Sequence, residues 1–333
     1  MIKVALLGNL YLFIYTRPCF CNRDWLFLHM EQFEIHILGC GSALPTTRHN
    51  ASSQVIRIGN KQFMIDCGEG TQRELRKQHI HFSFINHIFI SHLHGDHCFG
   101  LIGLISTFGL LGRTAPLHIY ADSKLEELMK PQIEFFCNGM HYPIFFHNID
   151  CSKREIIFED NTITVESVPL KHRLATCGFI FREKPKQRHL IGEAVNFYNI
   201  PTYMRQAIKD GADYTTPDGD VIPNSRLTKD ADPSRSYAYC SDTAPCPENC
   251  EYLKDVDLLY HEATFADSEK ERAAQTFHST ARQAAEIARD SNAKRLLIGH
   301  YSSRYETLDT LLKEAKEVFP NTICAIEGMT VTI

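Results

Sequence analysis

The stretch His92-Leu93-His94-Gly95-Asp96-His97 (HLHGDH) places three histidines and one aspartate within six residues. Neutral imidazoles and carboxylates are the ligands that Zn²⁺ prefers, and Mn²⁺ and Fe also accept them. Four such groups cannot all face one ion from a regular element, but a loop that Gly95 allows to turn sharply can divide them between two ions. The apolar segment before the stretch predicts a buried loop at a strand end, where unpartnered polar groups would be costly.

Three more candidate ligands each follow a predicted strand: His172 after residues 162–170, Asp242 after 236–240 and His300 after 295–298. Taken singly, a histidine of this kind is more often an ordinary surface or core residue. Together with the loop at 92–97, these residues make seven ligands. That number suits two ions which share a bridging carboxylate and a water.

Short apolar segments alternate with amphipathic ones along most of the chain, which predicts an α/β fold. Further strands are expected at 33–38, 54–58, 62–65, 87–91, 117–121 and 155–158, and helices at 70–79, 123–136, 277–291 and 308–318. The candidate ligands lie just past strand ends, where α/β folds expose their functional loops.

One segment, at about 181–235, breaks this rhythm because it is rich in Pro, Gly, Asp and basic residues. We expect it to be an insertion that projects from the core, with a short helix near 201–209. Its basic run consists of Arg182, Lys184, Lys186 and Arg188. Such a run can bind phosphates, although a solvated charged face is the commoner explanation.

The composition of the 333-residue chain fits a cytoplasmic globular protein: 44% of residues are apolar, and the formal charge is −5. This charge excludes a globally basic nucleic-acid binder, so any RNA contact must be local. The twelve cysteines form no pair of CxxC knuckles, so we interpret them as reduced thiols. Residues 1–29 are expected to be an extension outside the core domain at 30–333. Their apolar run is too short to span a bilayer, and the alternative is a processed targeting segment.

The HLHGDH loop is similar to the HxHxDH signature of the metallo-β-lactamase superfamily, and the resemblance extends from about residue 31 to the C-terminus. It implies a four-layer αββα sandwich with two mixed sheets face to face and helices outside. It also implies two Zn²⁺ per subunit, although Mn²⁺ or another divalent ion would suit the same ligands. The implied ligand sets are His92, His94 and His172 for one ion, Asp96, His97 and His300 for the other, and Asp242 as the bridge.

Further stretches resemble the ribonuclease Z family within that superfamily. They are residues 41–46 (GSALPT) with Asn50, 66–72 (DCGEGTQ), 261–264 (HEAT), 277–281 (FHSTA) and 299–305 (GHYSSRY). The resemblance implies an endoribonuclease that removes the 3′ trailer from precursor tRNA. The products would be a 3′-hydroxyl on the tRNA and a 5′-phosphate on the trailer.

The resemblance also implies roles for individual residues. Asp96 would be both a ligand and the acceptor of the attacking water's proton, and His278 would stabilise charge or protonate the leaving 3′ oxygen. The basic run and Asn50 would contact RNA, and the protein would be a homodimer in which one subunit's arm grips RNA cut by the other. The chain departs from the family pattern at His49, where an Arg is usual, and in lacking a Gly-Pro arm tip.

Two other functions remain open from the sequence. One is a two-metal phosphodiesterase or other hydrolase of a small substrate, which would need no arm. The other is a catalytically inactive RNA-binding module, against which the complete ligand set argues. Deletion of the arm separates the first alternative from a tRNA-processing enzyme, and metal analysis tests the second.

Overall fold

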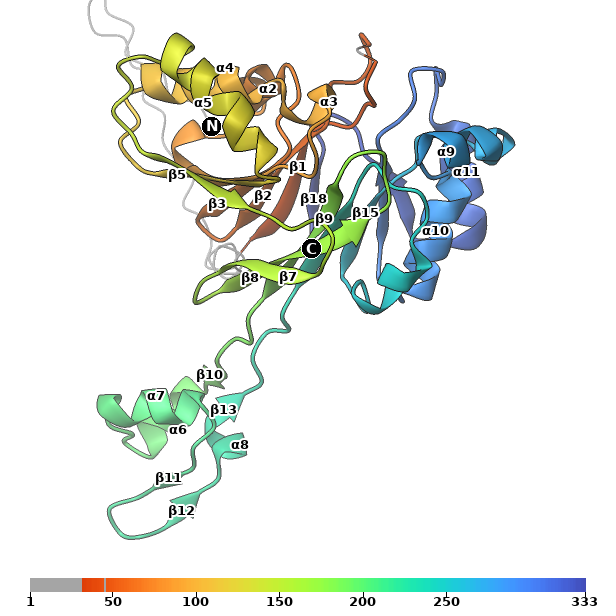
Figure 1. Cartoon of the computed structure of the whole chain (residues 1–333). Coiled ribbons are helices and arrows are strands. Elements are labelled where there is room, and N and C mark those ends of the chain that lie inside the picture. The colour runs from red at the N-terminus through yellow and green to blue at the C-terminus, as the bar shows by residue number, and fades with distance from the viewer. Residues whose placement is uncertain (1–31, 45) are drawn as a thin grey trace, which may run out of the picture. The chain divides into compact units, whose positions relative to one another are not determined.

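The fold rests on two seven-stranded sheets, seen in the computed structural model in Figure 1, which describes residues 32–44 and 46–333. In spatial order the first sheet contains β18 (Thr330–Thr332), β1 (Phe33–Gly39), β2 (Ser53–Ile58), β3 (Lys61–Ile65), β4 (Ile85–Phe89), β5 (Leu117–Ala121) and β6 (Ile144–Asn148). The second contains β17 (Thr322–Cys324), β16 (Leu296–Gly299), β15 (Leu258–Glu262), β14 (Ser236–Cys240), β9 (Thr176–Glu183), β8 (Ile163–Leu170) and β7 (Glu155–Glu159). The predicted extension at 1–29 lies outside the described residues.

Each sheet is mixed, as the resemblance implied. Strands β3 to β6 run parallel in the first sheet, and β14 to β17 run parallel in the second, while the other neighbours pair antiparallel. Parallel strands place their carboxyl ends at one edge of a sheet, which is where functional loops gather in such folds.

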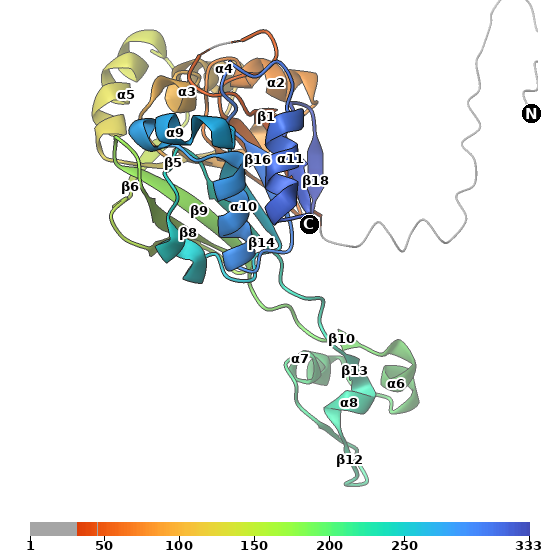
Figure 2. The same ribbon diagram turned by 90° about the vertical axis from the view of Figure 1, so that its right-hand side faces the viewer.

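Helices cover the outer face of each sheet, which completes the four layers (Figures 1 and 2). On the first sheet they are α2 (Thr71–Lys77), α3 (Gly95–Cys98), α4 (Leu101–Leu110) and α5 (Lys124–Phe136); beside the second are α9 (Lys270–Thr276), α10 (Ala281–Asp290) and α11 (Asp309–Val318). The predicted metallo-β-lactamase fold is therefore confirmed. No helix within the described ranges is long and apolar enough to cross a membrane.

Side-chain alternation along the strands explains the layering. On β3, Phe63 and Ile65 join the apolar cluster that includes residues of both sheets, whereas Met64 joins the cluster that includes residues of α4 and α5. Successive side chains of a strand point to opposite faces, so one strand can contribute apolar side chains to a core on each face of the sheet. The body of the protein thus has an apolar layer on each side of the first sheet.

Helix α10 packs on the second sheet through small side chains. Ala284, Ala285 and Ala288 are fully buried in the core, which lets the helix backbone lie close to the sheet. The predicted start of this helix at residue 277 was wrong. Thr280 and Gln283 form a reciprocal capping box that begins the helix at Ala281. Phe277 instead ends α9 in a left-handed conformation.

The segment between β9 and β14 forms a small unit with its own apolar cluster (Figure 1). Its elements are β10 (His189–Leu190), α6 (Gly192–Phe197), η2 (Thr202–Met204), α7 (Arg205–Lys209), β11 (Tyr214–Thr215), β12 (Val221–Ile222), α8 (Asn224–Leu227) and β13 (Thr228–Lys229). Because β9 extends to Glu183 and β14 begins at Ser236, the outermost residues of the predicted 181–235 insertion belong to the sheet or its edge. We call residues 184–235 the arm.

Candidate metal centre

All seven predicted ligands converge where strands of the two sheets end. The loop after β4 and the short helix α3 supply His92, His94, Asp96 and His97; the loops after β8, β14 and β16 supply His172, Asp242 and His300. Ligand-type atoms fall into two groups, each within 4.8 Å, and Asp242 belongs to both. Sequence reasoning therefore identified every member of both groups.

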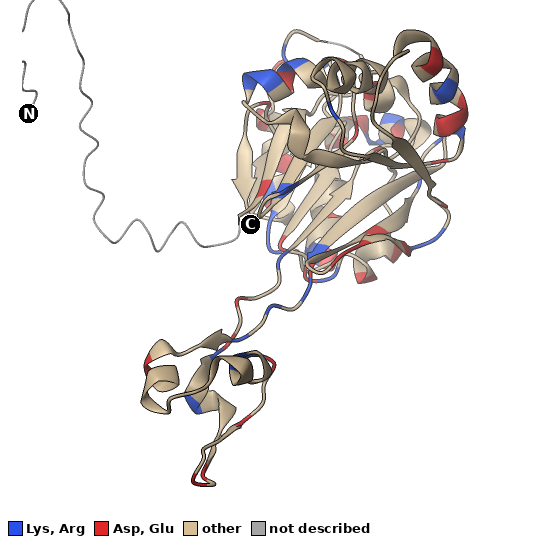
Figure 3. Cartoon of the chain, turned by 90° about the vertical axis from the view of Figure 1, so that its left-hand side faces the viewer, with Lys and Arg blue, Asp and Glu red and all other residues tan. Residues whose placement is uncertain are grey.

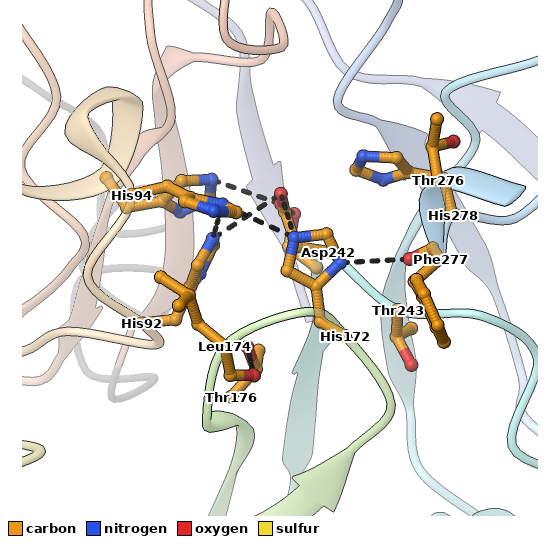
Figure 4. A network of polar contacts seen from close by, with 12 residues as sticks. His92, His94, His172, Leu174, Thr176, Asp242, Thr243, Thr276, Phe277 and His278 are labelled. Atoms are coloured by element: carbon orange, nitrogen blue, oxygen red, sulfur yellow. Dashed lines mark hydrogen bonds and ion pairs between the residues drawn. The ribbon is translucent and has the colours of Figure 1, made fainter.

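The first group consists of three imidazoles and one carboxylate oxygen (Figure 4). His92 Nε2 lies 2.9 Å from His94 Nδ1, and His172 Nε2 lies 3.3 Å from the same atom. Asp242 Oδ2 is 3.5 Å from His92 Nε2. Burial lowers the pKa of all three histidines, so they are neutral at neutral pH and can offer lone pairs.

The second group gathers around the other oxygen of Asp242. Asp242 Oδ1 is 3.1 Å from His97 Nε2 and 3.0 Å from His300 Nε2, and Asp96 Oδ2 is 3.5 Å from both nitrogens. Asp96 Oδ2, His97 Nε2 and His300 Nε2 are buried without a hydrogen bond. Buried polar atoms normally have partners, so this arrangement fits a divalent cation between them.

The backbone turns sharply at three of the contributing strand ends. Asp66 after β3, Asp242 after β14 and His300 after β16 have φ of 56°, 57° and 59°. Asp and His enter this left-handed region more readily than most residues, but at a cost that the surrounding structure must offset. The turn allows the backbone to leave the sheet while the side chain remains at the centre.

Asp66 supports the centre without belonging to either group. Its Oδ2 accepts hydrogen bonds from His97 Nδ1 at 2.7 Å, Tyr239 Oη at 2.7 Å and Ser91 Oγ at 3.0 Å, and its Oδ1 accepts one from Ser91 N at 2.8 Å. A proton on His97 Nδ1 leaves the Nε2 lone pair for the centre. Although burial opposes charging, Asp242, Asp66 and Asp96 raise the pKa of His97, so the pocket favours positive charge.

Glu262, at the end of β15, orients His278 as Asp66 orients His97, through a hydrogen bond to the ring Nδ1. The fully buried carboxylate lies 2.8 Å from His278 Nδ1 and also accepts hydrogen bonds from Thr243 N and Ser279 N. Burial opposes protonation of His278, but the charge of Glu262 and its hydrogen bond prevail and raise the pKa of His278 to about 9. Glu262 also accepts from Thr264 Oγ1, which is 2.9 Å from His300 Nδ1. Through Thr264, Glu262 thus connects His278 to the candidate ligand His300.

A cavity of about 260 Å³ opens onto this centre. Its lining includes His94, Asp96, His172, His278 and His300, and Arg173 contributes a cation. Arg173 is exposed, whereas the seven candidate ligands are buried or half-buried. A phosphodiester could therefore meet positive charge at the mouth and the His/Asp groups behind it.

The residues predicted to contact RNA lie apart from this cavity, and each has a partner within the chain. Asn50 donates through Nδ2 to the Leu38 carbonyl. The four cations of the basic run each reach a carboxylate: Arg182 reaches Glu166, Lys184 reaches Glu159, Lys186 reaches Glu183 and Arg188 reaches Asp230. Their role in RNA binding stays a prediction, and these ion pairs would have to exchange for phosphate contacts.

Comparison with known proteins identifies the family. The chain is 57% identical over 304 residues to Ribonuclease Z of Bacteroides fragilis strain YCH46, covering 91% of this chain and 100% of the relative. The corresponding protein of Porphyromonas gingivalis strain W83 is 54% identical with the same coverage. The chain belongs to the ribonuclease Z family. It is therefore a hydrolase, an endoribonuclease, that depends on divalent metal.

Family profiles and solved structures agree with the metallo-β-lactamase fold. A profile described as anti-Pycsar protein Apyc1 matches residues 33–185, and a beta-lactamase superfamily domain matches residues 223–301. Human tRNase Z, short form, has a TM-score of 0.66 at 24% identity and covers 90% of this chain and 99% of its own. The Bacillus subtilis metallo-beta-lactamase fold protein YhfI has a TM-score of 0.64 at 18% identity, covering 91% of this chain and 100% of its own.

Sequence reasoning assigned no role to Asp66, Ser91, Tyr239 or Arg173. Asp66 carried the same signal as the ligands, since it directly follows a predicted strand. Ser91 and Tyr239 gave no such signal, because each contacts Asp66 from a different part of the chain: Ser91 from the segment after the neighbouring strand β4, and Tyr239 from β14 of the other sheet. Arg173 follows a predicted ligand directly in sequence, which could have drawn attention to it.

Proposed function

We propose that this ribonuclease Z family member removes the 3′ trailer from precursor tRNA at the His/Asp centre, using two Zn²⁺ ions per chain. The observation that carries the proposal is the convergence of seven ligands in two groups joined by Asp242, in a chain 57% identical to proteins named Ribonuclease Z. The proposed products are a tRNA 3′-hydroxyl and a trailer 5′-phosphate. This substrate implies action in the cytoplasm.

Charge balance supports two divalent cations. Four carboxylates lie buried in or beside the centre: Asp66, Asp96, Asp242 and Glu262. Protonated His278 offsets the charge of Glu262, so the other three carboxylates leave a charge of −3. This exceeds what one divalent cation would neutralise, and isolated buried charges are costly. When bound, such ions activate water and neutralise charge on a phosphodiester. Mn²⁺ would suit the same donors, although the imidazole-rich first group favours Zn²⁺.

The chain's own residues divide the proton transfers between them. Asp96 lines the cavity, and its Oδ2 lies 3.5 Å from His97 Nε2 and His300 Nε2, so its carboxylate could accept the proton of the attacking water. His278 has Nδ1 engaged by Glu262, so Nε2 is the nitrogen that can donate a proton to the leaving 3′ oxygen. Glu262 orients that imidazole and favours its protonated form. Water as the nucleophile makes the ribose 2′-hydroxyl unnecessary for cleavage.

We propose that recognition of the tRNA depends on the arm and on Arg173. Figure 3 shows Lys and Arg, with acidic residues among them, along the two connections of the arm, whereas the tip of the β11–β12 hairpin carries acidic residues. Phosphate contacts should therefore concentrate near the connections, with Lys184, Lys186 and Arg188 among them. Such contacts would recognise shape and backbone rather than sequence.

We also propose that the chain forms a homodimer through an apolar surface on α4 and α5. Leu110 is 86% exposed and Phe135 is 79% exposed, and both lie near further exposed apolar residues of these neighbouring helices. Exposed apolar patches commonly mark protein interfaces. Sedimentation of Leu110→Ser and Phe135→Ser variants tests this: a dimer weakened by both supports it, and an unchanged sedimentation coefficient contradicts it.

Deletion of the arm tests the proposed substrate against a small one. Residues 186–232 should be replaced by a short Gly-Ser linker, which retains the ion pair between Glu183 and Arg235 at the base of the arm. All seven proposed ligands and His278 lie outside the deletion. We expect loss of precursor tRNA cleavage and retention of bis(p-nitrophenyl) phosphate hydrolysis. Equal loss on both substrates would mean that the arm supports the core, and unchanged RNA cleavage would mean that the arm takes no part in RNA recognition.

A charge variant gives a milder version of this test. Gln replacements at Lys184, Lys186 and Arg188 should raise the KM for RNA and flatten its salt dependence, by roughly 0.7–0.9 in the logarithmic slope for each phosphate that is no longer neutralised. A matched control carries Gln at three exposed lysines of the body, Lys254, Lys313 and Lys316. Equal effects of the two triple variants would contradict a specific role for the arm cations.

A further inference from the structure

A second cluster of metal-ligand type lies outside the centre described above. Cys40, directly after β1, His49, in the following loop, and Glu327, between β17 and β18, bring one ligand atom each within 4.8 Å of one another. Cys40 is fully buried, and His49 and Glu327 are largely so. Among the cysteines of the described residues, only Cys40 belongs to such a group.

The spacing of these atoms fits a tetrahedral ion. A tetrahedral ion has bonds of about 2.0–2.1 Å to nitrogen or oxygen and about 2.3 Å to sulfur. The ligand atoms themselves then lie roughly 3.3 Å apart for N and O, and roughly 3.6 Å apart when one of them is S. The structure has Cys40 Sγ 3.6 Å from His49 Nδ1, while Glu327 faces the two residues through different oxygens: Oε1 is 3.5 Å from Cys40 Sγ and Oε2 is 3.0 Å from His49 Nδ1. Distances between ligand atoms in the seven-residue centre are similar and include values from 2.9 to 3.8 Å.

Several acceptors around this cluster compete for one thiol proton. The Cys40 thiol has one proton but faces three acceptors: the Ala325 carbonyl at 3.3 Å, Glu327 Oε1 and, in one tautomer, His49 Nδ1. A divalent cation could meet several of these lone pairs at once. A divalent cation bound by a thiolate, a carboxylate and a neutral imidazole would form a site of zero net charge, which suits a buried position.

The cluster also lies where an ion would hold separate parts of the chain together. The Glu327 carboxylate accepts hydrogen bonds from Cys40 N and Asn50 N, and so joins the C-terminal segment to the loop that carries Asn50. The Cys40 carbonyl accepts from Tyr301 N, directly after the ligand His300. An ion here would fix the loop beside the cavity without touching the reacting atoms.

We propose that Cys40, His49 and Glu327 form a third, structural site for a thiophilic divalent cation of the Zn²⁺ class. The fourth position would be taken by water or solvent-derived oxygen. Binding replaces the thiol proton of Cys40, which passes to solvent, so occupancy should increase with pH. The site is independent of the proposed catalytic reaction, because it contains none of the seven residues assigned to the main centre.

Cobalt substitution of the full chain tests the proposal without measuring activity. A Co²⁺–thiolate bond gives a charge-transfer absorption in the near ultraviolet, and the main centre has only His and Asp ligands. We expect the metal-free chain titrated with Co²⁺ to bind three ions and to develop this absorption. Cys40→Ser should bind two ions and lack the absorption.

Two further variants keep the test decisive if Cys40→Ser does not fold. Glu327→Gln should also retain two ions and lose the third. Cys98→Ser is the matched control, since Cys98 adjoins the main-centre residue His97 but belongs to no ligand group, and it should retain three ions and the absorption. Two ions without thiolate absorption in the unaltered chain would overturn the proposal. So would absorption that persists in Cys40→Ser.

Discussion

Replacement of Asp66 by Asn should weaken ion binding although Asp66 is not a proposed ligand. Oδ1 accepts one hydrogen bond, from Ser91 N, and Oδ2 accepts three, including that of His97 Nδ1. The introduced asparagine has only one oxygen. Its NH₂ group must therefore replace either Oδ1, which accepts from Ser91 N, or Oδ2, which accepts from three donors. In the second orientation, His97 can satisfy the amide only by moving its proton to Nε2, which removes the lone pair directed at the centre.

The expected loss of metal affinity is moderate, because Asp66 orients a candidate ligand and is not itself a ligand. Loss of a partner that orients a metal-ligating histidine commonly costs 10–100-fold in metal affinity, or about 1.4–2.7 kcal/mol. The loss should be largest for the group with Asp96, His97 and His300, and smaller for the group with His92, His94 and His172. A buried donor left without an acceptor should also destabilise the metal-free protein by about 1–3 kcal/mol.

Competition with a chromogenic chelator at fixed free Zn²⁺ measures both affinities, and urea unfolding of metal-free protein measures the stability. Asp257→Asn is a matched control, because Asp257 also accepts hydrogen bonds from a backbone N–H and a hydroxyl, both of Ser236, at the opposite end of β14 from Asp242. The control should keep both affinities. If Asp66→Asn binds both ions as tightly as the unaltered chain, the proposed orientation of His97 by Asp66 is wrong.

Three other predictions concern the same centre. Chelation followed by dialysis should abolish RNA cleavage, and Zn²⁺ or Mn²⁺ should restore it; full activity of metal-free protein would disprove the metal requirement. His278→Ala should retain both ions by elemental analysis but lose at least about 10²-fold in turnover, as expected for a lost general acid; loss of an ion would instead make His278 a ligand. Glu262→Gln removes the charge that raises the pKa of His278 to about 9, so His278 should lose its proton at lower pH. The alkaline limb of the pH–rate profile should accordingly move to lower pH, and a stationary limb would argue against protonated His278 as the acid.

Local patterns predicted an α/β fold with candidate ligands at strand ends, because strands and their terminal polar residues are visible in the sequence. The resemblance to the metallo-β-lactamase superfamily implied the αββα arrangement and the two ligand sets. The hydrogen bonds around Asp66 were not predictable in this way, since they join residues of β14 and of the segments after β3 and β4. Likewise, the basic run showed its charges but not its acidic partners: Glu166 and Glu159 belong to β8 and β7.

The misplaced start of α10 has a different cause. Phe277 fits the apolar spacing of the helix, so periodicity alone extended the prediction to include it. The capping signal, Thr280 followed three residues later by Gln283, was present in the sequence and marks the observed start. Local hydrogen bonding at the helix end determined the boundary, and His278 consequently lies in the segment between α9 and α10, where its ring reaches Glu262.

The pairing of β9 with β14 has a consequence for how this enzyme family can diversify. The chain leaves the body at Glu183 and returns at Arg235, where the backbone N–H of Glu183 donates to the Arg235 carbonyl and their side chains form an ion pair. These contacts hold the two ends of the arm together, whatever residues lie between Glu183 and Arg235. Insertions, losses or wholesale exchange of the intervening residues can accumulate over evolution while the hydrolytic residues are inherited unchanged. New RNA substrates could therefore be acquired through this one segment.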